Sequence, residues 1–176
     1  MAASLPPPES GAGAGFLEET AFREALDAHF ATGSGFVSSL PAAAAAQDAY
    51  MVVCERDGGA RELSLTVTDC LSGVFRRRLG FADLEEVRRD AGMAEFAWTV
   101  FLRLLSSSLR GRDGCGGTLA PKGAAAGGHA VELALRFKLE AVTLVGRVEV
   151  PESVPAPAAP SAEVAAYLRE LRGFVR

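Results

Sequence analysis

Apolar residues in the first part of the chain recur with the spacing of a helix. Within residues 16–31, Phe22, Leu26 and Phe30 stand four residues apart, and charged residues fill the opposite side. A stripe of this kind is typical of a helix that covers a core with one face. The pattern predicts a short amphipathic helix over residues 16–31.

The segments on either side of this helix show no such period. Residues 1–15 consist largely of Pro, Gly, Ala and Ser, which bury too little apolar surface to offset the entropy of ordering. Residues 32–49 combine Gly33, Gly35 and Pro41 with a run of alanines. We expect a disordered lead at residues 1–15 and a linker at residues 32–49.

A period of two begins after this linker. Residues 50–56 form an apolar run, residues 57–59 supply Asp-Gly-Gly turn chemistry, and residues 62–69 alternate apolar with polar side chains. This pattern predicts a β-hairpin with one buried face. A third strand is expected at residues 73–79, where the run Arg76, Arg77, Arg78 interrupts the alternation.

Helical spacing returns after the third strand. Residues 82–91 carry Leu84 and Val87 on one side, and Gly92 follows as a stop signal. Residues 94–110 carry a wide apolar stripe. We expect these two helices to pack as a pair over the sheet.

The next segments complete the predicted head. Residues 111–128 are Gly-rich and are expected to form a loop, with a short strand at residues 118–121. Residues 129–137 and 141–150 alternate apolar and polar side chains and predict a second hairpin, or a pair of strands that meet across the sheet. The fold class is therefore α+β: an antiparallel β-sandwich or barrel-like head, residues 50–150, with a helix pair inserted after the third strand.

The C-terminal segment has the spacing of a coiled coil. A Pro-rich linker is expected at residues 151–160, and Ser161 is a candidate N-cap. Residues 161–176 then place apolar residues four, three and four positions apart, as at the start of a coiled-coil stalk. The predicted dimerisation residues are Val164, Leu168, Leu171 and Val175. We expect a homodimer.

Composition narrows the class of protein and its compartment. The net charge of −4 argues against a generally basic nucleic-acid binder. Three widely spaced cysteines, Cys54, Cys70 and Cys115, favour neither a disulfide framework nor a zinc site and are expected to be reduced thiols. The chain shows neither a signal-peptide pattern nor an apolar stretch of membrane-spanning length. These features predict a protein of the nucleus or cytosol.

Candidate residues for catalysis do not form a recognisable site. His29 and His129 lie outside any metal or triad motif, and residues 111–117 lack the Gly-Lys-Ser or Gly-Lys-Thr ending of a phosphate loop. Glu85 and Glu86 are explained by the solvated face of a helix. We therefore predict no catalytic residue, no metal ligand and no cofactor, and expect a protein-interaction module instead of an enzyme.

The arginine run at residues 76–78 is the one basic feature with a candidate role. Arginine engages phosphates and carboxylates with two parallel hydrogen bonds, so Arg76, Arg77 and Arg78 are candidate partner-binding residues. The alternative interpretation is a solvated strand surface. Aromatic residues do not interleave with the run, as stacking on single-stranded nucleic acid would require.

The order of elements resembles a known head domain. It is shared by the X-ray cross-complementing group-four ligase partner, XLF and PAXX, and by the centriolar cartwheel protein. The segments that carry the resemblance are Tyr50-Met51-Val52-Val53-Cys54-Glu55, Leu65-Thr66-Val67-Thr68-Asp69, residues 82–87 with Gly92-Met93, residues 144–150, and residues 162–175. The resemblance implies a non-catalytic head that dimerises through the following coiled coil.

Two branches of this superfamily remain open, and an unrecognised interaction module is a further alternative. The repair branch implies a scaffold of DNA double-strand-break end joining, located in the nucleus, with itself and other repair proteins as partners and DNA contacted indirectly. The cartwheel branch implies a centriole or basal-body assembly head, located in the cytoplasm. Phe137 and Lys138 stand where that branch usually has a Phe-Lys pair, which makes them candidate partner-binding residues. The cartwheel branch also has two consecutive Phe residues after the Thr-Asp strand. Val74-Phe75 stands there in this chain, which favours the repair branch.

Overall fold

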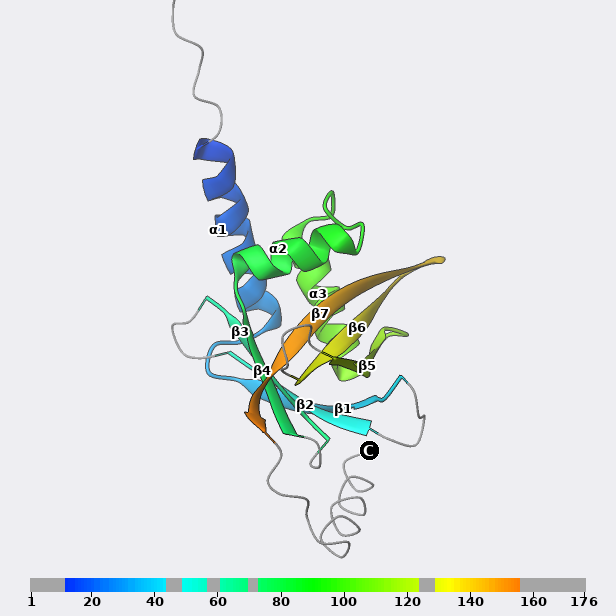
Figure 1. Ribbon diagram of the computed structural model, residues 1–176. Coiled ribbons are helices and arrows are strands. Elements are labelled where there is room, and N and C mark those ends of the chain that lie inside the picture. Colours follow the sequence, from blue (N-terminus) through cyan, green and yellow to red (C-terminus); the bar gives the residue numbers. More distant parts are fainter. Residues whose placement is uncertain (1–11, 44–48, 57–60, 70–72, 124–128, 156–176) are drawn as a thin grey trace, which may run out of the picture.

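A seven-stranded antiparallel sheet forms the frame of the protein (Figure 1). The computed structural model describes residues 12–43, 49–56, 61–69, 73–123 and 129–155. The predicted stalk with its dimerisation residues, together with Cys70 and residues 1–11, lies outside the described residues. In the described part, no helix is long and apolar enough to cross a membrane.

The sheet has the strand order β1-β2-β3-β4-β7-β6-β5 and curls toward closure. The strands are β1 (Gly35–Pro41), β2 (Ala49–Glu55), β3 (Leu63–Thr68), β4 (Gly73–Leu79), β5 (Gly116–Gly123), β6 (His129–Leu139) and β7 (Val142–Pro155). The two edge strands approach each other where the Ala43 amide donates to the Leu119 carbonyl at 2.7 Å, and Ala42 bridges the same residue. The result is a near-barrel, as the predicted fold class required.

Three helices pack on this frame. They are α1 (Ala12–His29), α2 (Phe81–Asp90) and α3 (Trp98–Arg110). Helix α3 lies against β1, β5 and β6, while α2 lies against β4 and β7. Helix α1 runs along α3 (Figure 1). The predicted helix pair therefore packs over the sheet. It follows β4, which is the third of the strands predicted from the sequence.

Helix α1 is a layer of the head. Phe22, Leu26 and Phe30 are all buried, and the Phe22 ring meets the edge or face of Phe81 and Trp98 with centroids 5.3 and 4.9 Å apart. The predicted stripe thus faces the core. The helix begins at Ala12, inside the predicted disordered lead, and ends at His29.

Strand β1 corrects the prediction of a linker over residues 32–49. Phe36, Ser38 and Leu40 face inward, and the middle one is polar, so the apolar alternation is broken. Ser38 is accommodated because its hydroxyl donates to the Leu109 carbonyl at 2.5 Å. This hydrogen bond to the end of α3 satisfies a polar side chain at an inward position. An alternating sequence pattern would have an apolar residue there.

Two other boundaries differ from the predictions. Strand β5 occupies more of the Gly-rich segment than residues 118–121, and at Gly117 it passes close to β1. A Cβ atom at Gly117 would lie 3.0 Å from the Leu40 Cδ1 atom. Strand β7 continues through residues 151–155, where a Pro-rich linker was expected, and its end pairs with the first residues of β4. Pro151 lies where β7 passes from pairing with β6 to pairing with β4: it stands opposite Ala130, and Glu152 stands opposite Phe75.

Candidate functional site

Residues with catalytic potential are dispersed. In the described part of the chain, no three His, Cys, Asp or Glu side chains gather as metal ligands would. Cys54 and Cys115 are free and buried, and burial raises the pKa of the Cys54 thiol to about 12. Such a thiol stays protonated at neutral pH and is a poor nucleophile.

The two histidines differ in environment. Burial and the charge of Arg103 lower the pKa of His29, against the opposing effect of a backbone hydrogen bond at Thr99. His29 is therefore neutral at physiological pH. His129 is exposed at the first residue of β6. These positions fit boundary residues of a helix and a strand.

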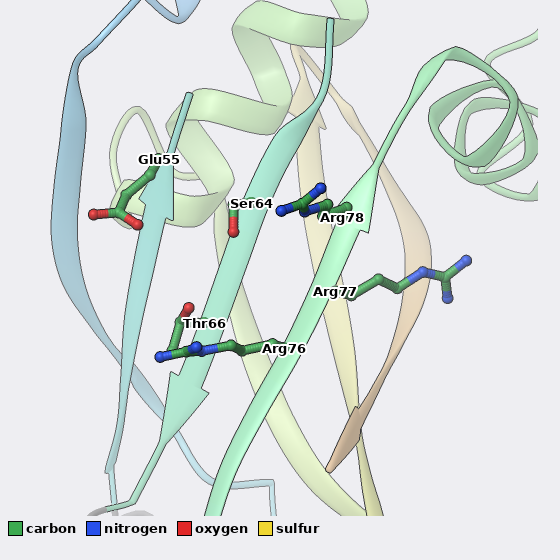
Figure 2. A pocket seen from close by; sticks show the side chains of 6 residues that line it. All are labelled: Glu55, Ser64, Thr66, Arg76, Arg77 and Arg78. Carbon is green, nitrogen blue, oxygen red and sulfur yellow. The ribbon is translucent and has the colours of Figure 1, made fainter. Parts of the chain in front are cut away.

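The three arginines of β4 point to opposite sides of the sheet (Figure 2). Arg76 and Arg78 lie on the outer face, while Arg77 points toward α2 and β7. Strand alternation forces this division, since successive side chains leave a strand in opposite directions. The sequence run therefore comprises two surface residues and one residue with a structural role.

Arg77 joins three elements. Its guanidinium donates to the Asp83 carboxylate at 2.8 Å and to the Glu149 carbonyl of β7 at 2.8 Å. The same carboxylate accepts the Gly80 amide at 3.1 Å, where α2 begins. Burial raises the pKa of Asp83, but the hydrogen bonds from Arg77 and Gly80 and the arginine charge outweigh it, so the pKa lies below its ordinary value.

This capping carboxylate gives stability a defined dependence on pH. Because the folded-state pKa of Asp83 is lowered, its contribution is complete above the ordinary aspartate pKa of about 3.9 and is lost as the pH falls through the folded value. We expect Asp83→Asn to cost about 1 kcal/mol of unfolding free energy at neutral pH. Urea unfolding at several pH values should show this difference shrinking in acid; a constant difference would contradict it. Asp90→Asn, at the other end of α2, is the control.

We call the outer surface formed by Glu55, Ser64, Thr66, Arg76 and Arg78 the arginine face. Across the strands, Thr66 stands opposite Arg76 and Ser64 stands between Glu55 and Arg78. The surface is hollowed into two adjoining depressions of about 310 and 230 Å³, and Arg78 lines both. Within the described residues, neither Arg76 nor Arg78 forms an ion pair.

Phe137 corrects part of the predicted partner site. Its side chain is fully buried and its ring packs edge-on against Phe101, with centroids 5.8 Å apart. Gly146 of β7 lies so close that a Cβ atom there would be 2.9 Å from the ring. Phe137 therefore belongs to the core and offers no surface to a partner. Lys138, the other predicted residue, is exposed next to it.

The β6–β7 hairpin extends past the helices (Figure 1), and the side chains at its end are apolar and partly or largely exposed. Leu139 pairs with Val142 across the hairpin end, and Leu144 follows on the same face as Val142. Val142 is 55% exposed, and Leu139 and Leu144 are half-buried. We call these three residues the hairpin tip. The alternating pattern predicted the hairpin, but not the exposure of Val142 at its end.

The structure also contains an apolar hollow that was not predicted. It lies between the start of α1 and the α2–α3 connection, has a volume of about 600 Å³ and includes Leu17, Phe96 and Trp98 in its lining. Beneath it, Arg88 stacks on the Trp98 ring at 4.2 Å, and the indole donates to Glu18 at 2.8 Å. This buried arginine ties the first turns of α1 to the helix pair.

Comparison with known proteins identifies the fold. No protein-family model and no curated protein matches the chain by sequence. Among solved structures, the head domain of human CCDC61 matches with a TM-score of 0.53 and 16% identity, over 70% of this chain and 99% of that domain. At this identity the match shows the fold alone: the chain has a head-domain fold of that kind, so the resemblance is confirmed at the level of fold.

Proposed function

We propose that this chain, with a head fold of the kind described above, is a non-catalytic assembly module that joins copies of itself through the hairpin tip. The observation that carries the proposal is the exposed apolar surface at the end of the β6–β7 hairpin. Leu139, Val142 and Leu144 continue the buried face of the two strands to the hairpin turn, where Val142 is 55% exposed and the other two are only partly buried against the core. Exposed apolar residues at a projecting edge mark contact surfaces.

A second copy of the same chain suits this surface. The hairpin tip is small, apolar and free of charged side chains on its core-facing side, and a two-fold arrangement would bury the same residues of both copies. The contact of one head is small compared with a standard protein interface. Repeated weak contacts of this kind suit an assembly whose subunits are also joined elsewhere, as the predicted stalk residues Leu168 and Leu171 would do.

Between the two branches of the superfamily we favour the centriole or basal-body assembly head. Phe137 and Lys138 lie in β6 just before the hairpin turn, where the cartwheel branch carries its Phe-Lys pair. The matched head is that of CCDC61, and the comparison lends no support to an end-joining role. The proposed location is therefore cytoplasmic, at basal bodies. Tagged full-length protein at nuclear damage foci would instead favour the repair branch.

Charge placed at the hairpin tip should weaken self-association. Val142→Glu sets a carboxylate in the apolar contact, and we expect the self-association constant to fall at least about tenfold in sedimentation equilibrium. Thr143→Glu makes a similar change on the other face of the hairpin and should alter the constant by less than about twofold. Equal constants for the wild type and Val142→Glu would contradict the proposal.

A further inference from the structure

We infer that the arginine face binds an extended acidic segment of a partner protein, with carboxylates at alternate positions of that segment. This surface lies on β2, β3 and β4, on other strands than the hairpin tip, and the inference does not depend on self-association. Its basis is a pair of arginines without ion-pair partners in the described part, set over two adjoining hollows.

The spacing of the two arginines matches an extended ligand. Arg76 and Arg78 leave the same face of β4 two residues apart, which places their Cα atoms about 6.6–6.8 Å apart. A ligand in extended conformation repeats its same-side residues at that distance. Two carboxylates at positions i and i+2 therefore reach the two guanidinium groups together, each as a charge-assisted pair.

The neighbouring charges set where the acidic groups bind. Glu55 faces the same hollows from β2, so it repels carboxylates there and leaves the β4 side favourable. Arg56 is buried and bound to Asp27 at 2.7 Å, and Arg77 is turned toward Asp83. The hydroxyls of Ser64 and Thr66 lie between, as further donors.

A peptide suits the surface better than nucleic acid does. Nucleic-acid affinity grows with the number of neutralised phosphates. Of the arginines that line the two hollows, Arg56 and Arg77 are already paired with carboxylates, so the surface offers two unpaired arginines beside Glu55 in a chain of net charge −4. None of the residues that line the two hollows is aromatic, so bases would find no stacking partner. An acidic segment of a protein needs neither a large number of cations nor aromatic stacking partners.

The test uses a labelled eight-residue peptide in which Glu and Thr alternate, titrated with the full chain by fluorescence anisotropy at low salt. A peptide of the same composition with its Glu residues in one block tests the spacing, and one with Gln for Glu tests the charge. We expect the alternating peptide to bind several-fold more tightly than either. Equal binding of the alternating and block peptides would overturn the inference.

Variants assign the binding to the arginine face. Arg76→Gln and Arg78→Gln should each weaken binding about threefold, and the double variant about tenfold. Glu55→Gln should strengthen binding, a gain that a misfolded variant would not give. Arg89→Gln, an exposed arginine on α2, should leave binding unchanged.

Outcomes against the inference are equally defined. Wild-type binding by the double variant, or weaker binding by Glu55→Gln, would overturn it. So would displacement of the alternating peptide by inorganic phosphate at concentrations where chloride has no effect, because the surface would then be a simple anion site. Circular dichroism of each variant confirms that the fold is retained.

Discussion

Replacing Phe22 with Ala will lower the free energy of unfolding by about 3–5 kcal/mol. The side chain is 1% exposed and packs against both Phe81 and Trp98, so truncation removes buried area and leaves a cavity between α1, α2 and α3. Neighbouring elements cannot close that cavity without breaking the ring contacts. Urea unfolding followed by tryptophan fluorescence measures the change directly, because Trp98 is the single tryptophan of the chain.

The same helix provides the matched control. Phe16 is 68% exposed, and Phe16→Ala should change the unfolding free energy by less than about 0.5 kcal/mol. A large gap between the two variants establishes α1 as a layer of the head. A loss below about 1 kcal/mol for Phe22→Ala would mean that α1 does not contribute to the core and would overturn this part of the structure.

Phe137→Ala will also cost about 3–5 kcal/mol. The ring is fully buried against Phe101 and fits closely against Gly146, so its removal opens a cavity beneath the β6–β7 hairpin near its turn. Lys138→Ala, one residue further along the strand, should change stability by less than about 0.5 kcal/mol because its side chain is exposed. Thermal and urea unfolding of both variants provide the comparison.

The outcome distinguishes a core residue from a docking residue. If Phe137 contacted a partner directly, Phe137→Ala would weaken association and leave the unfolding free energy of the head nearly unchanged. That result would contradict the packing described here. If Phe137→Ala lowers the unfolding free energy as we expect, any effect of this variant on assembly is indirect and follows from displacement of the hairpin.

Strands whose inward residues are all apolar could be predicted from the sequence. Strand β4 has the predicted bounds despite its arginines, because Phe75 and Leu79 still mark the buried face. Strand β1 was missed because its inward Ser38 is satisfied by a carbonyl of α3, a partner that lies 71 residues away. Local periodicity has no access to such a long-range hydrogen bond.

The candidate site was only partly predictable for similar reasons. The sequence singled out the arginine run, but the sheet decides that Arg76 and Arg78 face outward while Arg77 joins α2 to β7. The Phe-Lys pair drew attention to the β6–β7 hairpin, whereas burial removes Phe137 from the surface. The exposure of Val142 depends on which part of the sheet the helices cover. The alternation of residues along the strand does not predict this.

The most direct test of the central claim is hydrogen–deuterium exchange of the full chain at low and high protein concentration. The hairpin-tip assembly predicts that amides of residues 139–145 exchange more slowly as concentration rises, while those of the arginine face do not change. Exchange at the hairpin that is independent of concentration, across a range in which sedimentation shows association, would contradict the claim. The head would then assemble through a different surface.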